Sequence, residues 1–162
     1  MLDAHAIELV VDVRTIAKSR HNPQFGSEEL AGSLDEHGIS YQRLEELGGL
    51  RHTTKISVNG AWKNASFRGY ADYMQTREFA AGIDHLLGTA AEATTVIMCA
   101  EALPWRCHRS LIGDALLVRG IEVVDIMSGT ATRPHTITRF ARVVGTEITY
   151  PPEPETPRLP GL

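Results

Sequence analysis

Short apolar runs rich in β-branched residues alternate along this chain with segments of helical spacing, and this order limits the folds that it can adopt. Four runs have the composition of buried strands, at residues 7–13 (IELVVDV), 39–44, 94–98 (TTVIM) and 121–126 (IEVVDI). Strands that are apolar along their whole length are typical of parallel sheets with helices on both faces. The sequence therefore predicts an α/β fold of three layers, with a mainly parallel sheet and the run at 94–98 near its centre.

Helix signals fill the intervals between these runs. Ser27 predicts a helix start, with acidic residues in the first turn, and Gly38 predicts the end of that helix. We expect one Rossmann-like or flavodoxin-like domain over residues 1–149, followed by a proline-rich tail over 150–162 that is extended or disordered. The other expected segments are a long connection at 50–69 and helices around 70–74, from Thr76 to about Gly88, over 109–119 and over 136–144.

Composition limits the partners and the location that we expect. The 162 residues carry a net charge of −4, which argues against general coating of nucleic acid, because such binding depends on neutralising phosphates. No apolar run approaches the ~20 residues that a membrane helix needs, and the first residues lack the pattern of a secretory leader. We therefore expect a cytoplasmic protein without a membrane partner, whose two cysteines, Cys99 and Cys107, are thiols. The oligomeric state is left open.

Basic side chains gather in segments that should lie at one edge of the sheet. In open parallel sheets, ligands bind where loops leave the carboxyl ends of the strands. Because the chain as a whole is acidic, basic groups concentrated at that edge predict an anion site, and the alternative is that these charges only face water. The four loops are 14–26 with Arg14, Lys18, Arg20 and His21, the segment after 44 with Arg51, His52 and Lys55, 99–109 with Arg106, His108 and Arg109, and 127–135 with Arg133 and His135.

The loop at 99–109 carries the most reactive side chains. Cys107 precedes a predicted helix and stands beside His108, so backbone N–H groups and the helix dipole are expected to lower its pKa if the thiol is exposed. A thiolate next to an imidazole is a known nucleophilic arrangement. Cys99 follows a buried strand and fits a small core residue, although a catalytic role beside Cys107 stays open.

Neighbouring polar residues complete the candidate catalytic and anion-binding set. Arg109 and Ser110 open the helix, where backbone amides and a guanidinium can bind phosphate oxygens. The alternative for Arg109 is an ion pair with Glu101 or Asp114. Glu101 is a candidate general acid or base, and could equally hold Arg106 in place.

The segment after the first predicted strand supplies further candidates. Asp12 and Arg14 are two residues apart on a strand and point to the same face, which favours a structural ion pair over catalysis. Ser19 and Arg20, followed by His21, fit a loop that contacts phosphate or a solvated turn.

No cofactor is predicted, because the chain has neither a glycine-rich dinucleotide fingerprint nor a phosphate loop. A metal ion is an alternative: Cys99, Cys107 and His108 are suitable donors and His135 could join them, but their spacing matches no zinc signature. A set of aromatic residues could stack on nucleic-acid bases, although core packing is the commoner role at such spacing. These residues are Trp62, Phe67, Tyr70 and Tyr73.

Five motifs occur in order along the chain: VDVRTIAKSRHNPQF, GISY, LGG, YADYMQTREF and MCAEALPWRCHR. In this combination, over about residues 11–126, the chain resembles the bacterial family called domain of unknown function 488 (DUF488). The resemblance implies a loose link to DNA repair and no established activity. Carried onto this chain, the recurring positions of the family are Asp12, Arg14, Ser19, Arg20, Cys99, Glu101, Cys107, His108 and Arg109.

The segments VVDVR, VIMC and HRSLIGDALLVRGIEVVDI are also distantly similar to rhodanese-like and cysteine phosphatase domains. In those domains a strand ends in a nucleophilic cysteine, and an anion-cradling loop leads into a helix. The loop from Cys99 to Arg109 is longer than those tight cradles and contains Pro104 and Trp105. Direct transfer of sulfurtransferase or phosphatase activity is therefore not expected.

Together these features predict an enzyme, a cysteine-dependent hydrolase or transferase. Its expected ligand bears phosphate, as a nucleotide or a nucleic-acid component, and the expected centre is Cys107, His108 and Arg109. One alternative is a non-catalytic module that binds nucleotides or nucleic acid in DNA repair or modification. Another is a protein that binds a metal ion through cysteine and histidine.

Overall fold

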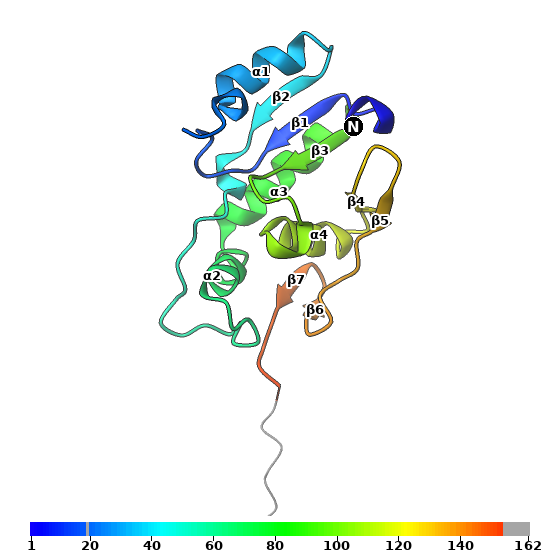
Figure 1. Cartoon of the computed structure of the whole chain (residues 1–162). Helices are drawn as coiled ribbons and strands as arrows, with labels where there is room; N and C mark the ends of the chain where they lie inside the picture. The colour runs from blue at the N-terminus through cyan, green and yellow to red at the C-terminus, as the bar shows by residue number, and fades with distance from the viewer. Residues whose placement is uncertain (19, 154–162) are drawn as a thin grey trace, which may run out of the picture.

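A three-stranded parallel sheet organises the fold in the computed structural model, which describes residues 1–18 and 20–153 (Figure 1). The strands are β1 (Leu9–Asp12), β2 (Ser40–Arg43) and β3 (Thr95–Met98), in the order β2-β1-β3. All three lie within predicted runs, so these predictions are confirmed. The expected central position of 94–98 was wrong, because β1 is the strand with a partner on each side.

The described part of the chain contains four α-helices: α1 (Ser27–Asp35), α2 (Ala65–Tyr73), α3 (Arg77–Ala90) and α4 (Arg109–Leu117). Thr76 caps α3 as predicted, since its hydroxyl accepts a hydrogen bond from the Phe79 N–H at 3.2 Å. The connection expected at 50–69 is shorter than predicted, because Asn64 caps α2 by accepting from the Ser66 N–H at 2.8 Å. None of the described helices is long and apolar enough to cross a bilayer.

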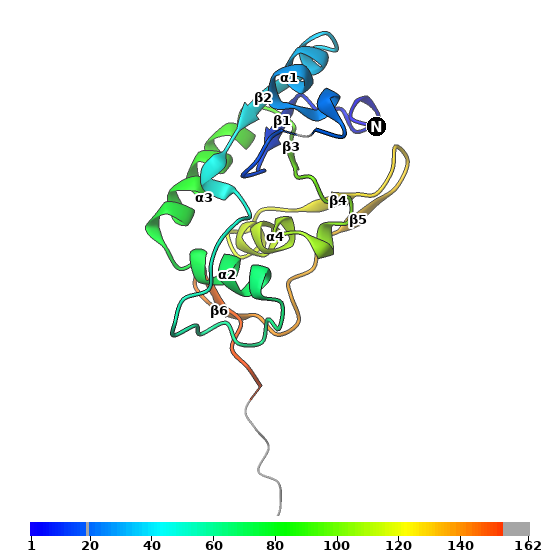
Figure 2. The ribbon, with the colours of Figure 1, turned by 60° about the vertical axis from the view of Figure 1, so that its left-hand side comes forward.

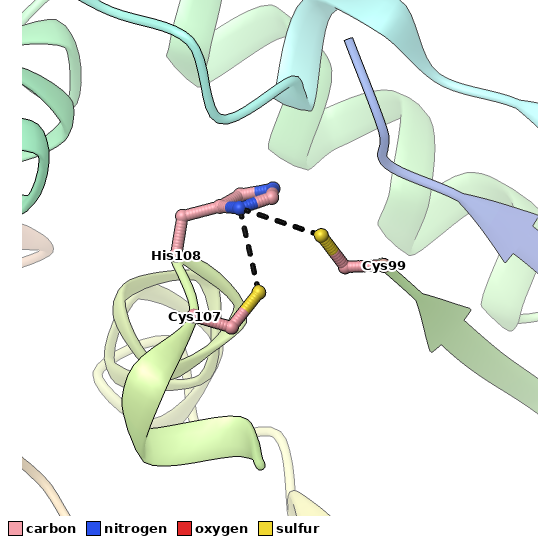
Figure 3. A group of neighbouring side chains, drawn as sticks. All are labelled: Cys99, Cys107 and His108. Carbon is pink, nitrogen blue, oxygen red and sulfur yellow. Dashed lines mark hydrogen bonds between the residues drawn. The ribbon is translucent and has the colours of Figure 1, made fainter. Parts of the chain in front are cut away.

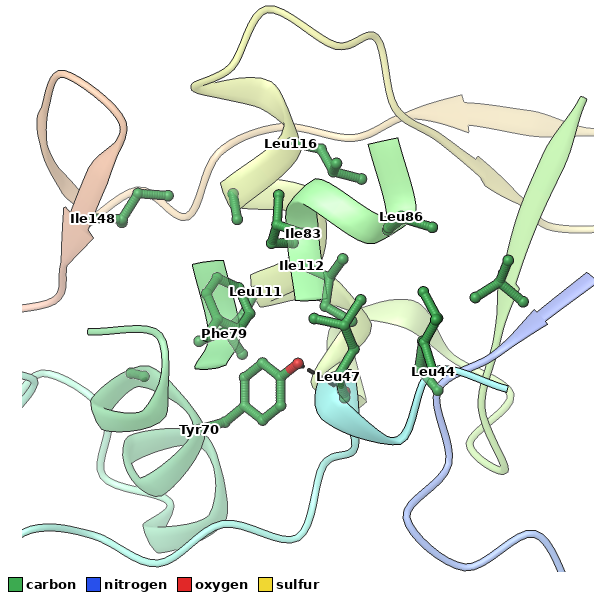
Figure 4. Packing of buried hydrophobic residues seen from close by; sticks show 14 of the residues in the cluster. Leu44, Leu47, Tyr70, Phe79, Ile83, Leu86, Leu111, Ile112, Leu116 and Ile148 are labelled. Carbon is green, nitrogen blue, oxygen red and sulfur yellow. Dashed lines mark hydrogen bonds between the residues drawn. The ribbon is translucent and has the colours of Figure 1, made fainter. Parts of the chain in front are cut away.

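Successive side chains of β1 enter two different apolar clusters, which explains why this run is apolar throughout. Val10 packs with Leu34 of α1 and with Ile39. Val11, fully buried, belongs to the larger cluster that contains side chains of α3 and α4. Figure 4 shows this cluster, in which the α4 residues Leu111 and Ile112 lie close to α3 and to the segment after β2.

Two predictions for the C-terminal third were wrong. The run at 121–126 does not join the parallel sheet: β4 (Val124–Ile126) pairs in antiparallel fashion with β5 (Thr132–Pro134). The helix expected over 136–144 is replaced by a hairpin of β6 (Arg142–Val144) and β7 (Glu147–Thr149). Gly145 has a φ of +62°, the backbone conformation that a two-residue hairpin turn requires, so turn chemistry outweighs the helical spacing.

The hairpin region is attached to α4 through one buried carboxylate. α4 lies between the parallel sheet and this hairpin (Figures 1 and 2). Asp114 is fully buried and accepts hydrogen bonds from Tyr150 Oη (2.9 Å), the Thr138 N–H (3.1 Å) and His135 Nε2 (3.0 Å). Tyr150 is itself part of the core, so the packed region extends to this residue, whereas residues 154–162 of the expected tail lie outside the described residues.

A second carboxylate folds the connection that precedes α2. Asp72 of α2 accepts hydrogen bonds from both the N–H and the hydroxyl of Thr54, from Ser57 Oγ and from Asn59 Nδ2. Burial of the carboxyl acts to raise the pKa of Asp72, but these hydrogen bonds lower it below the ordinary value. A connection of low periodicity is therefore ordered by one side chain rather than by a strand or helix.

Replacing Asp114 should loosen the whole C-terminal segment. We expect Asp114→Ala to lower the free energy of unfolding by about 3–5 kcal/mol, because it leaves one buried and two partly buried donors without an acceptor. Urea unfolding followed by circular dichroism measures the change. Asp84→Ala, on the exposed face of α3, is the matched control and should stay within about 0.5 kcal/mol of the wild type. Equal losses in the two variants would contradict the anchoring role.

The stability that the contact between His135 and Asp114 contributes should depend on pH. The hydrogen bond to Asp114 raises the pKa of His135 above the unfolded value of about 6.5. A raised pKa means that the folded state favours the charged imidazole, so its contribution is fully present below about pH 6.5 and is lost as the pH rises through the folded pKa. The stability difference between wild type and His135→Gln should therefore shrink from pH 6 to pH 9. A difference that does not change with pH would rule out this linkage.

Candidate functional site

Three of the four loops predicted at the carboxyl edge of the parallel sheet meet there, whereas the fourth, 127–135, follows β4, which pairs with β5 outside this sheet. The strands are in register, with Asp12 opposite Arg43 on one side and Met98 on the other, so their ends are level. After β1, Thr15 Oγ1 accepts a hydrogen bond from the Leu50 N–H of the loop after β2 at 3.1 Å. The loop after β3 begins at Cys99 and returns to this edge at the start of α4.

His108 is the residue that joins these loops. Its Nε2 lies 3.1 Å from the carbonyl oxygen of Val13, just after β1. Because a carbonyl only accepts hydrogen bonds, Nε2 carries the hydrogen, and this leaves Nδ1 facing two sulfur atoms (Figure 3). Nδ1 lies 3.5 Å from Cys107 Sγ and 3.9 Å from Cys99 Sγ.

Gly49 and Tyr70 hold the imidazole from its sides. A Cβ atom on Gly49 would lie 2.4 Å from His108 Nδ1, so only glycine allows the backbone to pack directly on the ring. The ring of Tyr70, a fully buried core residue, lies 4.9 Å from the His108 ring between centroids. The orientation of His108 is therefore fixed by backbone, glycine and core together.

Cys107 is surrounded by groups that favour its thiolate. A hydrogen bond from the Cys99 thiol lowers the pKa of Cys107, and His108 and the backbone N–H of Arg109 lower it further, against the opposing effect of burial. Arg109 Nε also donates to Cys107 Sγ at 3.4 Å. The pKa of Cys107 is thus lowered although the thiol is buried, whereas the sequence prediction concerned an exposed thiol.

Cys99 has the opposite character. The hydrogen bond that it gives to Cys107 raises its own pKa, and burial raises it further, so Cys99 keeps its proton. It packs partly against the core, as the sequence suggested, and its sulfur also belongs to the group around His108. The anion held at the start of α4 is thus the Cys107 thiolate, with Cys99 as a neutral donor.

The side chains expected to bind an external anion are partly committed to the protein. Arg109 Nη2 donates to the backbone oxygens of Glu101 and Ala102, which closes the loop over α4. Ser110 is buried, and its hydroxyl donates to the Cys107 carbonyl at 2.9 Å. The side chain of Glu101 is exposed on the same loop.

In the loop after β1, one candidate arginine is bound within the protein and another is exposed. Arg14 forms the expected structural ion pair with Asp12, and its Nη1 donates to the Phe25 carbonyl at 2.8 Å. Burial acts to raise the pKa of Asp12, but hydrogen bonds from Arg14 and from Tyr41 lower it below the ordinary value. Of the two phosphate candidates on this loop, Arg20 is exposed and Ser19 lies outside the described residues.

Three donor atoms in the site have the spacing of metal ligands. The sulfurs of Cys99 and Cys107 and the Nδ1 of His108 all lie within 4.8 Å of one another. No other group of three or more such side chains occurs in the part of the chain that the structure describes. His135, considered as a fourth ligand, is bound to Asp114 instead.

Sequence reasoning missed the groups that orient His108. The Gly48-Gly49 pair predicted only the end of a strand, although its close approach to the imidazole is the reason for the second glycine. The Val13 carbonyl carries no residue-type signal at all. The aromatic set considered for base stacking belongs to the core: Trp62, Phe67 and Tyr73 pack against the buried cluster that contains Tyr70.

One protein family matches most of the chain. Residues 1–116 match the sequence model of the family described as "Domain of unknown function DUF488". The match spans the parallel sheet and nearly all of α4, and therefore includes every residue placed in the site. No curated protein and no solved structure is significantly similar to the chain.

Gly49→Ala should disturb the site without unfolding the protein. The new methyl group would overlap the His108 ring, so the imidazole must move away from both sulfurs. We expect the rate of Cys107 alkylation by iodoacetamide to fall at least about tenfold, because small misplacements of a reacting pair are costly. Gly88→Ala is the matched control, since nothing lies within 4 Å of a Cβ there. Equal alkylation rates in the two variants would show that the ring position is unimportant.

Proposed function

The chain belongs to the DUF488 family, and from that premise we propose that it is an enzyme, a cysteine-dependent hydrolase or transferase, that acts on a phosphate-bearing ligand. The ligand class is a nucleotide or a nucleic-acid component. The observation that carries the proposal is the environment of Cys107, whose sulfur lies 3.5 Å from His108 Nδ1 and 3.4 Å from Arg109 Nε at the start of α4. A thiolate beside an oriented imidazole is a general arrangement for nucleophilic catalysis.

The proposed reaction has two steps at Cys107. The thiolate attacks an electrophilic atom of the substrate, a bond from sulfur to that atom forms, and the leaving group departs with its electron pair. Nδ1 of His108 holds the proton that the thiol gives up and can return it to the leaving group. Water or a second acceptor then displaces the sulfur, which restores the thiolate. Glu101 is the proposed acid or base for this second step, since its side chain is exposed on the same loop.

Exposed positive charge near the site supports an anionic ligand. Cations that reach solvent occur on all three loops at the carboxyl edge. Their positive electrostatic potentials add where these loops meet. Trp105, on the loop after β3, is 46% exposed and lies under the Arg133 guanidinium at 4.6 Å, which offers a flat surface to a base. The exposed cations are Lys18, Arg20, Lys55 and Arg106.

The proposal includes a finer description of the fold and the location. We take the architecture to be three-layered, of the Rossmann-like, flavodoxin-like or rhodanese-like kind. The alternation of Val10 and Val11 between two apolar clusters supports this. A pair of reduced thiols at the site supports a cytoplasmic location.

One observation favours a second candidate function. Cys107 is only 4% exposed, and a buried thiol suits a non-catalytic module that binds nucleotides or nucleic acid in DNA repair or modification. In that case the group around His108 would be a structural lock between α4 and the sheet. The two candidates differ in the reactivity of the sulfur.

Alkylation with iodoacetamide tests the proposal. Because the pKa of Cys107 is lowered, its rate of alkylation should stay nearly constant from pH 8 to pH 6, whereas the rate of free cysteine, with a pKa of about 8.5, falls about tenfold per pH unit. At pH 6 Cys107 should react faster than free cysteine, and inorganic pyrophosphate or a nucleotide should slow it. Mass spectrometry identifies the modified cysteine, with Cys107→Ser as the control.

The contrary result is equally clear. If the folded protein reacts at pH 6 no faster than free cysteine, the thiolate is not available to a substrate. The non-catalytic module would then be the better description.

A further inference from the structure

We propose that Cys99, Cys107 and His108 form a binding site for zinc with an open fourth position, and that zinc and a substrate compete for Cys107. The zinc site itself is independent of the proposed function. Only the competition rests on it, because a sulfur that is bound to zinc cannot also act as the free nucleophile. The same three side chains would thus bind a metal ion and, through it, limit the reactivity of Cys107.

The spacing of the donor atoms fits tetrahedral zinc. Zinc bonds of about 2.3 Å to sulfur and about 2.0–2.1 Å to nitrogen place a sulfur and a nitrogen ligand roughly 3.6 Å apart. The two sulfurs lie 3.5 and 3.9 Å from His108 Nδ1, and all three atoms lie within 4.8 Å of one another. A small ion can contact all three with little movement of the side chains.

His108 is already oriented as a ligand. Metal-bound histidines usually donate their second ring N–H to a carboxylate or a backbone carbonyl, which fixes the tautomer. Here Nε2 donates to the Val13 carbonyl at 3.1 Å, so the lone pair of the neutral ring is on Nδ1 and faces both sulfurs. The close packing of Gly49 prevents the ring from turning away.

The types of ligand, two sulfurs and one imidazole nitrogen, also favour a divalent soft cation. Zinc binds both sulfurs as thiolates and Nδ1 as a neutral donor, keeps one water, and displaces to solvent the protons that these atoms carried. Two thiolates neutralise the ion, and Arg109 Nε stays as a hydrogen-bond donor to the Cys107 sulfur at 3.4 Å.

Three protein ligands imply an accessible ion. Structural zinc sites are closed by four protein ligands, whereas sites with three keep a water or another exchangeable ligand. Within the described residues no fourth cysteine, histidine or carboxylate belongs to this group. We therefore expect bound zinc to exchange and to be removable by a chelator.

Cobalt, which reports its own coordination, is the probe for the test. The full chain is prepared without a histidine tag, reduced, stripped of metal and titrated with Co²⁺. We expect one equivalent to give the intense visible bands of tetrahedral cobalt and the near-ultraviolet bands of cobalt bound to thiolate, and Zn²⁺ to displace both. Cys99→Ser and His108→Gln should each weaken zinc binding by more than the roughly 10–100-fold that loss of an outer partner costs.

His37→Gln, at an exposed histidine of the segment after α1, is the matched control and should bind as the wild type does. Circular dichroism of each variant shows whether it has folded. Bands of octahedral cobalt without thiolate bands, or equal affinity in wild type and Cys99→Ser, would overturn the zinc site.

A competition experiment separates this inference from the proposed function. Zinc at one equivalent should slow the alkylation of wild-type Cys107 at least tenfold, and a chelator should restore the rate. Fast alkylation of the metal-free protein without any cobalt signal would overturn the zinc site and leave the enzyme proposal standing. A cobalt signal from a protein whose metal-free Cys107 reacts slowly would support the zinc site and count against the enzyme. Cobalt binding without protection from alkylation would overturn the competition.

Discussion

The hydrogen bond between His108 Nε2 and the Val13 carbonyl is the constraint on which the rest of the site depends. It links the start of α4 to the end of the central strand and determines which nitrogen faces the sulfurs. Cys99 and Cys107 would otherwise be two thiols at the ends of one loop. The hydrogen bond between them lowers the pKa of Cys107 and raises that of Cys99, and the fixed imidazole lowers the pKa of Cys107 further. Both proposals for this cluster start from the position of the imidazole beside the two sulfurs.

Much of the fold could be predicted because its signals are local. Apolar runs gave β1, β2 and β3, and the hydroxyl of Thr76 marked the start of α3. The C-terminal third could not be predicted in the same way. A short run such as 121–126 has the same composition in a parallel strand and in a hairpin, and the choice depends on contacts that are distant in sequence.

Part of the candidate site could also be predicted from the sequence, and part of it could not. Cys107, His108 and Arg109 were accessible to sequence reasoning, because their residue types and their position before a helix carry chemistry. The groups that position them were not: a backbone carbonyl is present at every residue, and the role of Gly49 follows only from its contact with the imidazole. The placement of Arg14 and Arg109 also needed coordinates, since a guanidinium can bind a carbonyl of the protein as readily as a phosphate.

α4 is attached to the rest of the protein by polar contacts at two points along its length. The Cys107 sulfur and the His108 imidazole lie at its start. Six residues after His108, Asp114 accepts hydrogen bonds from Tyr150 and His135 of the C-terminal segment. At 1.5 Å per residue these points are roughly 9 Å apart along a rigid axis. The helix therefore holds the C-terminal attachment at a fixed separation from His108 and Cys107. The residues of this second attachment that follow α4, His135 and Tyr150, lie beyond the family match, so a feature outside the shared region holds the helix that carries the shared site.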